Sequence, residues 1–203
     1  MNMHMPQSMT AETELMMLPA VTQQLISPSK NSPIIGIFQD SLLGCFRFTR
    51  DTVKMTKKDA MNLLMMCKKV DLSRLRNAKT NNQYSSFDVL SHIFPPLTMK
   101  QKTKLFDSSK DDEYNKNRSI LIRNGEYVKG QLEKSVIASA SMGILHRITN
   151  DFNNETCVQF IDDLQNIITE YMRTSSFSVG ISDLIANKKT KQEILQVVDK
   201  QKQ

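Results

Sequence analysis

The longest regular alternation of hydrophobic and polar positions in the chain lies between Glu155 and Arg173. Its hydrophobic residues recur at intervals of three and four: Cys157, Phe160, Ile161, Leu164, Ile167, Ile168, Tyr171 and Met172. This spacing places them on one face of an α-helix. Asn154 is suited to cap the start of the helix, and Ser175 and Gly180 indicate its end. We therefore predict a long amphipathic helix whose apolar face is buried.

The hydrophobic pattern nearer the start of the chain predicts a turn, a strand and a helix. Pro28 and Pro33 bound a turn, and the apolar run 34–38 that follows predicts a buried strand. Asp40 or Ser41 can cap a short helix after that strand. Further apolar stripes predict helices over residues 10–18 and 190–203, with Thr10 and Thr190 as caps: Leu15, Met16 and Leu18 in the first, and Ile194, Leu195, Val197 and Val198 in the second.

Local capping and turn residues predict three more elements in the middle of the chain. Thr56 and Asp59 have capping-box spacing at the start of a helix, and another short helix is expected from Ser86. Asn124-Gly125 lies between apolar runs and predicts a β-hairpin with a type I′ turn. The fold class expected from all these elements is α+β, with amphipathic helices, a β-hairpin and a long helix.

Composition adds limits on the core and on partners. The chain has 203 residues, of which 39% are hydrophobic and 6% aromatic, with no Trp, so its core is modest. A net charge of +6 permits contact with polyanions. The lysines are spread along the sequence, which favours a solvated basic surface over one nucleic-acid patch.

Cysteine spacing and hydropathy concern the cellular setting. Cys45, Cys67 and Cys157 are far apart and have no Cys or His neighbours at metal-ligand spacing, so a zinc site or a disulfide framework is not expected. We interpret them as small core residues in a reducing compartment. The chain has no charged leader and no apolar run of ~20 residues. We expect a soluble, intracellular protein without a membrane partner.

Five stretches, in this order along the chain, resemble successive blocks of the largest subunit of eukaryotic-type multisubunit DNA-directed RNA polymerases. They are residues 1–7, 25–44, 61–65, 130–146 and 177–186, the last containing Phe-Ser-Val-Gly-Ile-Ser-Asp. The resemblance is weak from Lys69 to Arg118. It implies three parts: the tail of the active-site domain at 1–24, the pore domain at 25–184, and the start of a truncated funnel domain at 185–203.

The resemblance implies a nucleotidyltransferase that extends RNA from ribonucleoside triphosphates on a DNA template. In that family Mg²⁺ is held by three clustered aspartates, and residues 1–7 resemble the segment directly after them. We therefore expect an internal fragment that binds no metal and is inactive alone, although the parent enzyme uses Mg²⁺. The acidic runs Asp111–Glu113 and Asp162-Asp163 are interpreted as solvated.

The resemblance also implies roles for single residues. Four are expected near the active centre of the assembled enzyme: His4, Gln7, Gln39 and Asp40. Glu133 and Lys134 are expected along the pore, or secondary channel, where a lysine can attract phosphate. The alternatives are that Gln39 and Asp40 serve backbone capping and that Lys134 simply pairs with Glu133. His146 is interpreted as a core or helix-face histidine.

The expected partners are other polymerase subunits, especially the second-largest, together with the DNA template and RNA. The expected location is the nucleus for a cellular protein, and the virion or a cytoplasmic factory for a viral one. A different hypothesis remains open: a free-standing helical protein that docks on a polymerase or on nucleic acid through its basic surface.

Overall fold

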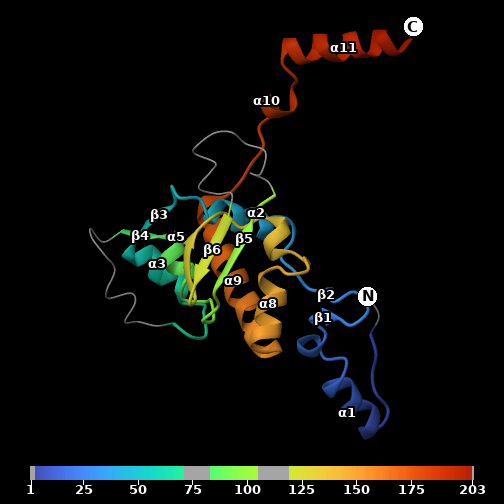
Figure 1. Ribbon diagram of the computed structural model, residues 1–203, viewed down its shortest axis with the longest axis vertical. Helices are drawn as coiled ribbons and strands as arrows, with labels where there is room; N and C mark the ends of the chain where they lie inside the picture. The colour runs from blue at the N-terminus through green and yellow to red at the C-terminus, as the bar shows by residue number, and fades with distance from the viewer. Residues whose placement is uncertain (1–2, 71–82, 105–118, 203) are drawn as a thin grey trace. The chain divides into compact units, whose positions relative to one another are not determined.

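The computed structural model describes residues 3–70, 83–104 and 119–202 and divides the chain into two compact units. Unit 1 comprises Met1–Arg173 and unit 2 comprises Thr174–Gln203. Figure 1 shows mixed helical and strand structure with small antiparallel sheets, which confirms the α+β class. The acidic run Asp111–Glu113 lies outside the described residues.

The helices and strands carry the labels of Figure 1. The helices are α1 (Met9–Met17), the 3-10 helix η1 (Val21–Gln23), α2 (Gln39–Phe48), α3 (Lys57–Leu64), α5 (Ser86–Leu90), α7 (Lys134–Ile137), α8 (Ile144–Asp151), α9 (Asn154–Ser175), α10 (Ile181–Leu184) and α11 (Lys188–Lys202). The strands are β1 (Ile26–Ser27), β2 (Ser32–Pro33), β3 (Lys54–Thr56), β4 (Gln83–Ser85), β5 (Met99–Lys102), β6 (Ser119–Arg123) and β7 (Glu126–Lys129).

Helix α9 is the long amphipathic helix that the hydrophobic pattern predicts. Five of the eight predicted face residues are buried, and the other three are partly buried against the same core. The expected cap is wrong by one residue, because the Asn153 side chain accepts a hydrogen bond from the Thr156 amide at 2.7 Å while Asn154 is already helical. The interpretation of Asp163 as solvated is also wrong, because this residue is only 4% exposed.

Close packing of α2 against α9 forms part of the core of unit 1. A Cβ placed on Gly44 would lie 2.4 Å from Ile168 Cγ2, so the two helices approach closely because this position lacks a side chain. The rings of Phe48 and Tyr171 meet nearby, edge to face, at 4.9 Å. The Phe160 ring of α9 packs on Phe94 at 4.8 Å. Helix α9 therefore joins segments from both halves of unit 1.

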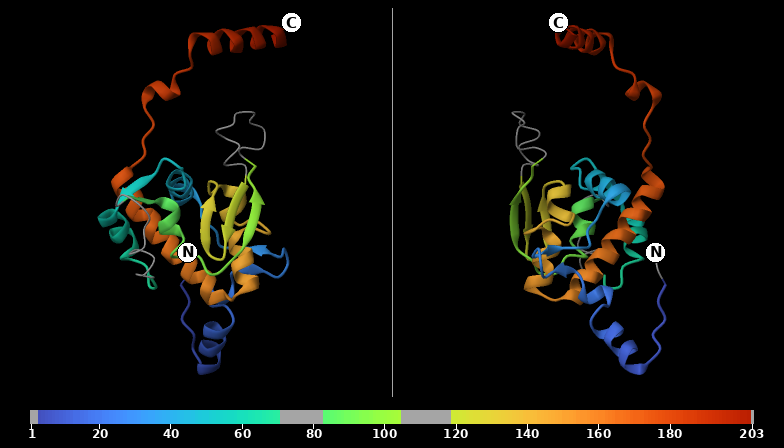
Figure 2. Two further views of the ribbon diagram at one scale, coloured as in Figure 1. Left: turned by 60° about the vertical axis from the view of Figure 1, so that its left-hand side comes forward. Right: turned by 90° about the vertical axis from the view of Figure 1, so that its right-hand side faces the viewer.

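The three-stranded sheet of unit 1 has the strand order β5-β6-β7. The predicted hairpin is confirmed: Asn124 and Gly125 join β6 to β7 with φ values of 45° and 78°, as a type I′ turn requires. Strand β5 was not predicted. In both views of Figure 2 the sheet lies on one side of unit 1 and α3 on the other. Buried residues of the sheet, including Ile120 and Ile122, belong to the common core.

The turn predicted between Pro28 and Pro33 is confirmed, because it joins β1 to β2. The buried strand expected over residues 34–38 is wrong: that run has no regular structure, and within it only Ile37 is fully buried. The segment is instead pinned by close backbone contact, since a Cβ on Gly36 would lie 2.7 Å from the amide nitrogen of Ser139. A short apolar run can therefore be buried without joining a sheet.

Capping predictions had mixed outcomes. The box of Thr56 and Asp59 is confirmed at the start of α3. Neither Asp40 nor Ser41 caps α2, because that helix already begins at Gln39. Ser8 caps α1 in place of Thr10, and Asn187 accepts from the Thr190 amide at the start of α11, where Thr190 was expected to be the cap.

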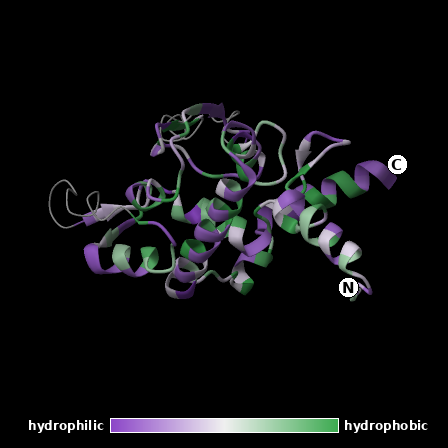
Figure 3. Cartoon of the chain, turned by 90° about the horizontal axis from the view of Figure 1, so that it is seen from below, coloured by the Kyte–Doolittle hydropathy of each residue, from purple (hydrophilic) through white to green (hydrophobic). Residues whose placement is uncertain are grey.

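Unit 2 contains α10 and α11, and none of its described residues is buried. Its four predicted stripe residues in α11 are exposed by 39% to 61%. Figure 3 shows hydrophobic and hydrophilic residues along this helix. The described helices include none that is long and apolar enough to cross a membrane.

Candidate functional site

Two distant segments of unit 1 meet at a groove of about 920 Å³. One is the start of α2, and the other runs from Glu133 through α7 to Ala140; Lys104, which follows β5, is held beside the second segment by Glu133. The apolar part of the lining consists of Phe38, Leu42, Leu43, Phe46, Ala138 and Ala140, and the polar part of Gln39, Lys104, Glu133, Lys134, Ser135 and Ser139. Three of the six predicted site residues, Gln39, Glu133 and Lys134, therefore lie in one place.

Glu133 is the buried acid of the groove, with 6% of its surface exposed. Its Oε1 accepts a hydrogen bond from the backbone amide of Lys104 at 2.6 Å and another from the hydroxyl of Ser135. It also occupies the position directly before α7, where a negative charge is favourable. This carboxylate joins the end of the β5 segment to the start of α7, and its first role is structural.

Lys134 follows Glu133 but is exposed. Within the described residues the ion-pair distance criterion is met by Arg173 and Glu170, so Lys134 does not pair with Glu133. Lys104 is also exposed and lies in the same lining. Because the Glu133 carboxylate is held by other donors, the groove presents two lysine ammonium groups to solvent.

Gln39 and Asp40 begin helix α2. Gln39 has φ 51°, a left-handed conformation that is uncommon for a residue other than Gly, Asn or Asp. Its side chain is exposed in the groove, whereas Asp40 is exposed in the first helical turn and does not line the groove. The carboxylate of Asp40 is well placed to interact with the positive end of α2.

The other predicted residues lie elsewhere. His4 and Gln7 are exposed before α1, and neither lines the groove. His146 is buried, as interpreted from the sequence, and its Nδ1 accepts a hydrogen bond from the Met142 amide at 2.9 Å. The Arg147 side chain donates to the Met142 carbonyl at 3.1 Å, so both backbone groups of Met142 are held. This pair fixes the loop that follows the groove.

Sequence patterns did not reveal Lys104 or Asp163 as important residues. The Asp163 carboxylate accepts from the amide of Lys68 at 3.3 Å and so ties the end of the α3 segment to α9. Burial first, and the Asp163 carboxylate second, raise the pKa of the Cys67 thiol from 9.0 to about 12. The one sequence signal that could have identified Asp163 is a polar residue beside the apolar positions of the α9 pattern.

Comparison with known proteins gives the family. The family described as RNA polymerase Rpb1, domain 3, matches residues 24–184, which is well over half of the chain. This chain belongs to that family. The groove, α9 and the β5-β6-β7 sheet all lie within the matched part, so they are features of an Rpb1 domain 3.

Curated relatives of this Rpb1 domain 3 chain extend the similarity beyond the matched domain. The DNA-directed RNA polymerase II subunits RPB1-B and RPB1-A of Trypanosoma brucei brucei are each 27% identical over 204 residues, covering 98% of this chain and 11% of the relative. DNA-directed RNA polymerase subunit 1 of Acanthamoeba polyphaga mimivirus is 27% identical over 199 residues, covering 98% of this chain and 12% of the relative. The chain thus spans about a tenth of the length of these relatives.

Proposed function

We propose that this chain serves as a structural part of the largest subunit of a DNA-directed RNA polymerase. The observation that carries the proposal is the family match over residues 24–184 combined with relatives that align along 98% of the chain. Those relatives are named as DNA-directed RNA polymerase II subunit RPB1-B and DNA-directed RNA polymerase subunit 1, the first from a trypanosome and the second from a mimivirus. The parent activity would be template-directed extension of RNA from ribonucleoside triphosphates.

The proposed division of the chain keeps three parts: 1–24 in the active-site domain, 25–184 in the pore domain and 185–203 in the funnel domain. In this arrangement the described residues of 25–173 build a rigid scaffold around α9, because that helix packs against both α2 and the Phe94 segment. A rigid scaffold suits a wall that must hold its shape while substrates pass.

We assign the groove lysines to the electrostatic part of that wall. Lys134 and Lys104 present positive charge without an ion-pair partner within the described residues, and this charge attracts phosphate groups at long range. Glu133 holds the lysine-bearing segments in place. Gln39, with Asp40, His4 and Gln7, is assigned to the side of the chain nearest the active centre. Of these four residues, Gln39 shares the groove with Lys134.

Mg²⁺ belongs to the parent activity and is not assigned to this chain. Among residues 3–70, 83–104 and 119–202, no group of three or more His, Cys, Asp or Glu side chains could hold a metal ion. Glu133 and Asp163, the buried acids described above, are both engaged by backbone amides. These side chains do not fit a Mg²⁺ site, and we route no catalytic step through them.

The proposed partners are the other polymerase subunits, the second-largest above all, with DNA template and RNA bound by the assembly. The proposed location follows the parent enzyme: the nucleus in a cell, or a virion or cytoplasmic factory for a virus. The relatives include both a cellular and a viral protein, and both settings therefore stay open.

The proposal is tested by purifying the tagged chain from its source and identifying the bound proteins by mass spectrometry. We expect the second-largest polymerase subunit in the complex, template-dependent RNA synthesis by the complex, and no nucleotide incorporation by the isolated chain. A monodisperse chain that recovers no polymerase subunit would contradict the proposal. Salt-dependent DNA binding by that chain would then favour the free-standing interaction protein.

The role of Lys134 has its own test in the assembled enzyme. Lys134→Gln should raise the KM for ribonucleoside triphosphates several-fold with little change in kcat, since long-range attraction affects capture and not chemistry. Lys57→Gln, at the exposed first turn of α3, removes the same charge outside the groove and serves as the control. If Lys134→Gln and Lys57→Gln changed the KM equally, Lys134 would have no special role in attracting nucleotides.

A further inference from the structure

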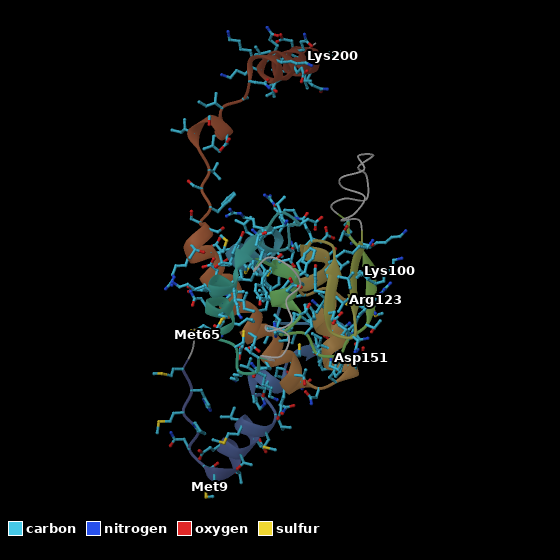
Figure 4. All side chains as sticks on the ribbon, turned by 90° about the vertical axis from the view of Figure 1, so that its left-hand side faces the viewer. Met9, Met65, Lys100, Arg123, Asp151 and Lys200 are labelled. Atoms are coloured by element: carbon cyan, nitrogen blue, oxygen red, sulfur yellow. The ribbon has the colours of Figure 1, made fainter. Side chains whose placement is uncertain are left out.

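The outer face of the β5-β6-β7 sheet gathers cations that the sequence spreads over thirty residues. Met99, Ile122 and Tyr127 face one another across the three strands and are buried. Strand alternation therefore turns Lys100 and Lys102 to the opposite face, where both are exposed. In Figure 4 the labelled Lys100 lies on the sheet side of unit 1.

A β-bulge adds a third lysine to this face. Leu121 pairs with Lys129 while the next residue, Ile122, pairs with Tyr127, so Val128 is one residue extra in β7. Without the bulge Lys129 would point to the same side as buried Tyr127. With it, Lys129 lies beside Leu121, which also pairs with Lys100. Lys100, Leu121 and Lys129 thus form one row across the sheet.

Within the part of this sheet that the structure describes, positive charge exceeds negative charge. Arg123, labelled in Figure 4, adds a fourth cation next to the hairpin turn, and its cross-strand neighbour Glu126 supplies one carboxylate. The two do not form an ion pair, since the described residues meet the distance criterion only at Arg173 and Glu170. We call this set the basic face: Lys100, Lys102, Arg123 and Lys129. Among the described residues of the three strands, four cations against one carboxylate leave a surplus of three positive charges.

We propose that the basic face binds the phosphate backbone of double-helical DNA. Uncompensated lysine and arginine side chains on an open surface match the chemistry of phosphate contacts, which give affinity without sequence readout. Within the described strands the face carries Leu121 and Val128 as its apolar members and has no aromatic side chain. Single-stranded nucleic acid is typically bound on aromatic stacking platforms, and this face therefore favours a duplex over a single strand.

The test measures binding of the full chain to a fluorescent DNA duplex of about 20 base pairs over a range of salt concentrations. The variant removes three cations of the basic face, as Lys100→Gln, Lys102→Gln and Lys129→Gln together. The control removes three exposed lysines of the β3 and α3 segment, as Lys54→Gln, Lys57→Gln and Lys58→Gln. The two variants have the same net charge, and circular dichroism verifies that both keep the wild-type helix content.

We expect the basic-face variant to bind at least about tenfold more weakly at moderate salt, with the slope of log K against log salt smaller by about 2 to 3. The control should stay within about twofold of the wild type. Equal losses in the two variants would overturn the proposal, as would equal or tighter binding of single-stranded DNA. Binding of polyglutamate, but not of the duplex, to the basic face would also overturn the proposal and would indicate an acidic protein as the partner.

This inference is independent of the proposed function. The chain can co-purify with polymerase subunits while the basic-face variant binds DNA normally, and then only the inference fails. The basic face can equally be confirmed in a chain that recovers no polymerase subunit.

Discussion

The carboxylate of Glu133 accepts the backbone amide of Lys104 at 2.6 Å and so joins two segments that lie 29 positions apart. Ser135 donates to the same oxygen. Without Glu133 the Lys104 amide would lose its acceptor at a point where it is partly buried, and burying an unpaired amide is costly. The geometry of the groove therefore depends on Glu133, a residue that the sequence analysis expected along the pore and not in a structural role.

Glu133→Gln should lower the free energy of unfolding by about 1 to 3 kcal/mol, because a charge-assisted hydrogen bond becomes a neutral one in a buried place. Urea denaturation of the chain, followed by circular dichroism, measures the change. Glu126→Gln is the matched control, because Glu126 is exposed on β7. If both variants unfold at the same urea concentration, Glu133 does not hold the segments together.

Asp163→Asn should destabilise the chain by about 1 to 2 kcal/mol, because the buried carboxylate accepts the Lys68 amide across 95 residues of sequence. Asp162→Asn is a close control, since Asp162 is adjacent and exposed. Thermal unfolding of the two variants gives the comparison. An Asp163 variant that is as stable as the Asp162 variant would show that the hydrogen bond from Lys68 adds nothing to stability.

Gly44→Ala should cost about 1 to 3 kcal/mol, because the added methyl group would lie 2.4 Å from Ile168 Cγ2 and 2.9 Å from Met172 Cγ. Gly180→Ala is the control, since its new Cβ would have no contact closer than 3.3 Å. The midpoint of urea unfolding should fall for the first variant alone. A smaller cost of Gly44→Ala in the Ile168→Ala background than in the wild-type chain would show that the clash lies between α2 and α9.

The sequence predicts the elements that are set by neighbouring residues better than those that are set by contacts between residues distant in the chain. The face of α9, the α3 capping box and the β6–β7 hairpin each follow from residues within one or two turns, and each is confirmed. Strand β5 has no alternating pattern of its own and is defined by pairing with β6, across residues distant in sequence. The run 34–38 was misassigned because its burial comes from backbone contact near Ser139 and not from a sheet.

The candidate site shows the same limit. Resemblance to a known family supplied Gln39, Glu133 and Lys134, but only the tertiary fold places them around one groove. Lys104 belongs to that groove through a backbone hydrogen bond, which leaves no trace in residue type. The basic face was missed for a related reason, since the bulge that brings Lys129 beside Leu121 depends on strand register.

Cys67 should be nearly inert to alkylation at pH 8. Burial first, and the nearby Asp163 carboxylate second, raise the pKa of its thiol from 9.0 to about 12, which lowers the thiolate fraction at pH 8 about a thousandfold. The Cys67 thiol therefore ionises at a lower pH in the unfolded chain than in the folded chain. The stability linked to this thiol is therefore complete below pH 9 and is lost as pH rises towards 12.

Labelling with iodoacetamide at pH 8, read by mass spectrometry, measures the effect. Asp163→Asn removes one cause of the raised pKa of Cys67 and should speed its labelling, whereas Asp162→Asn should not. Cys157, which is 1% exposed, is the internal reference, because general opening of the fold would expose both thiols. Labelling of Cys67 in the native chain as fast as in the urea-unfolded chain would show that neither burial nor Asp163 protects this thiol.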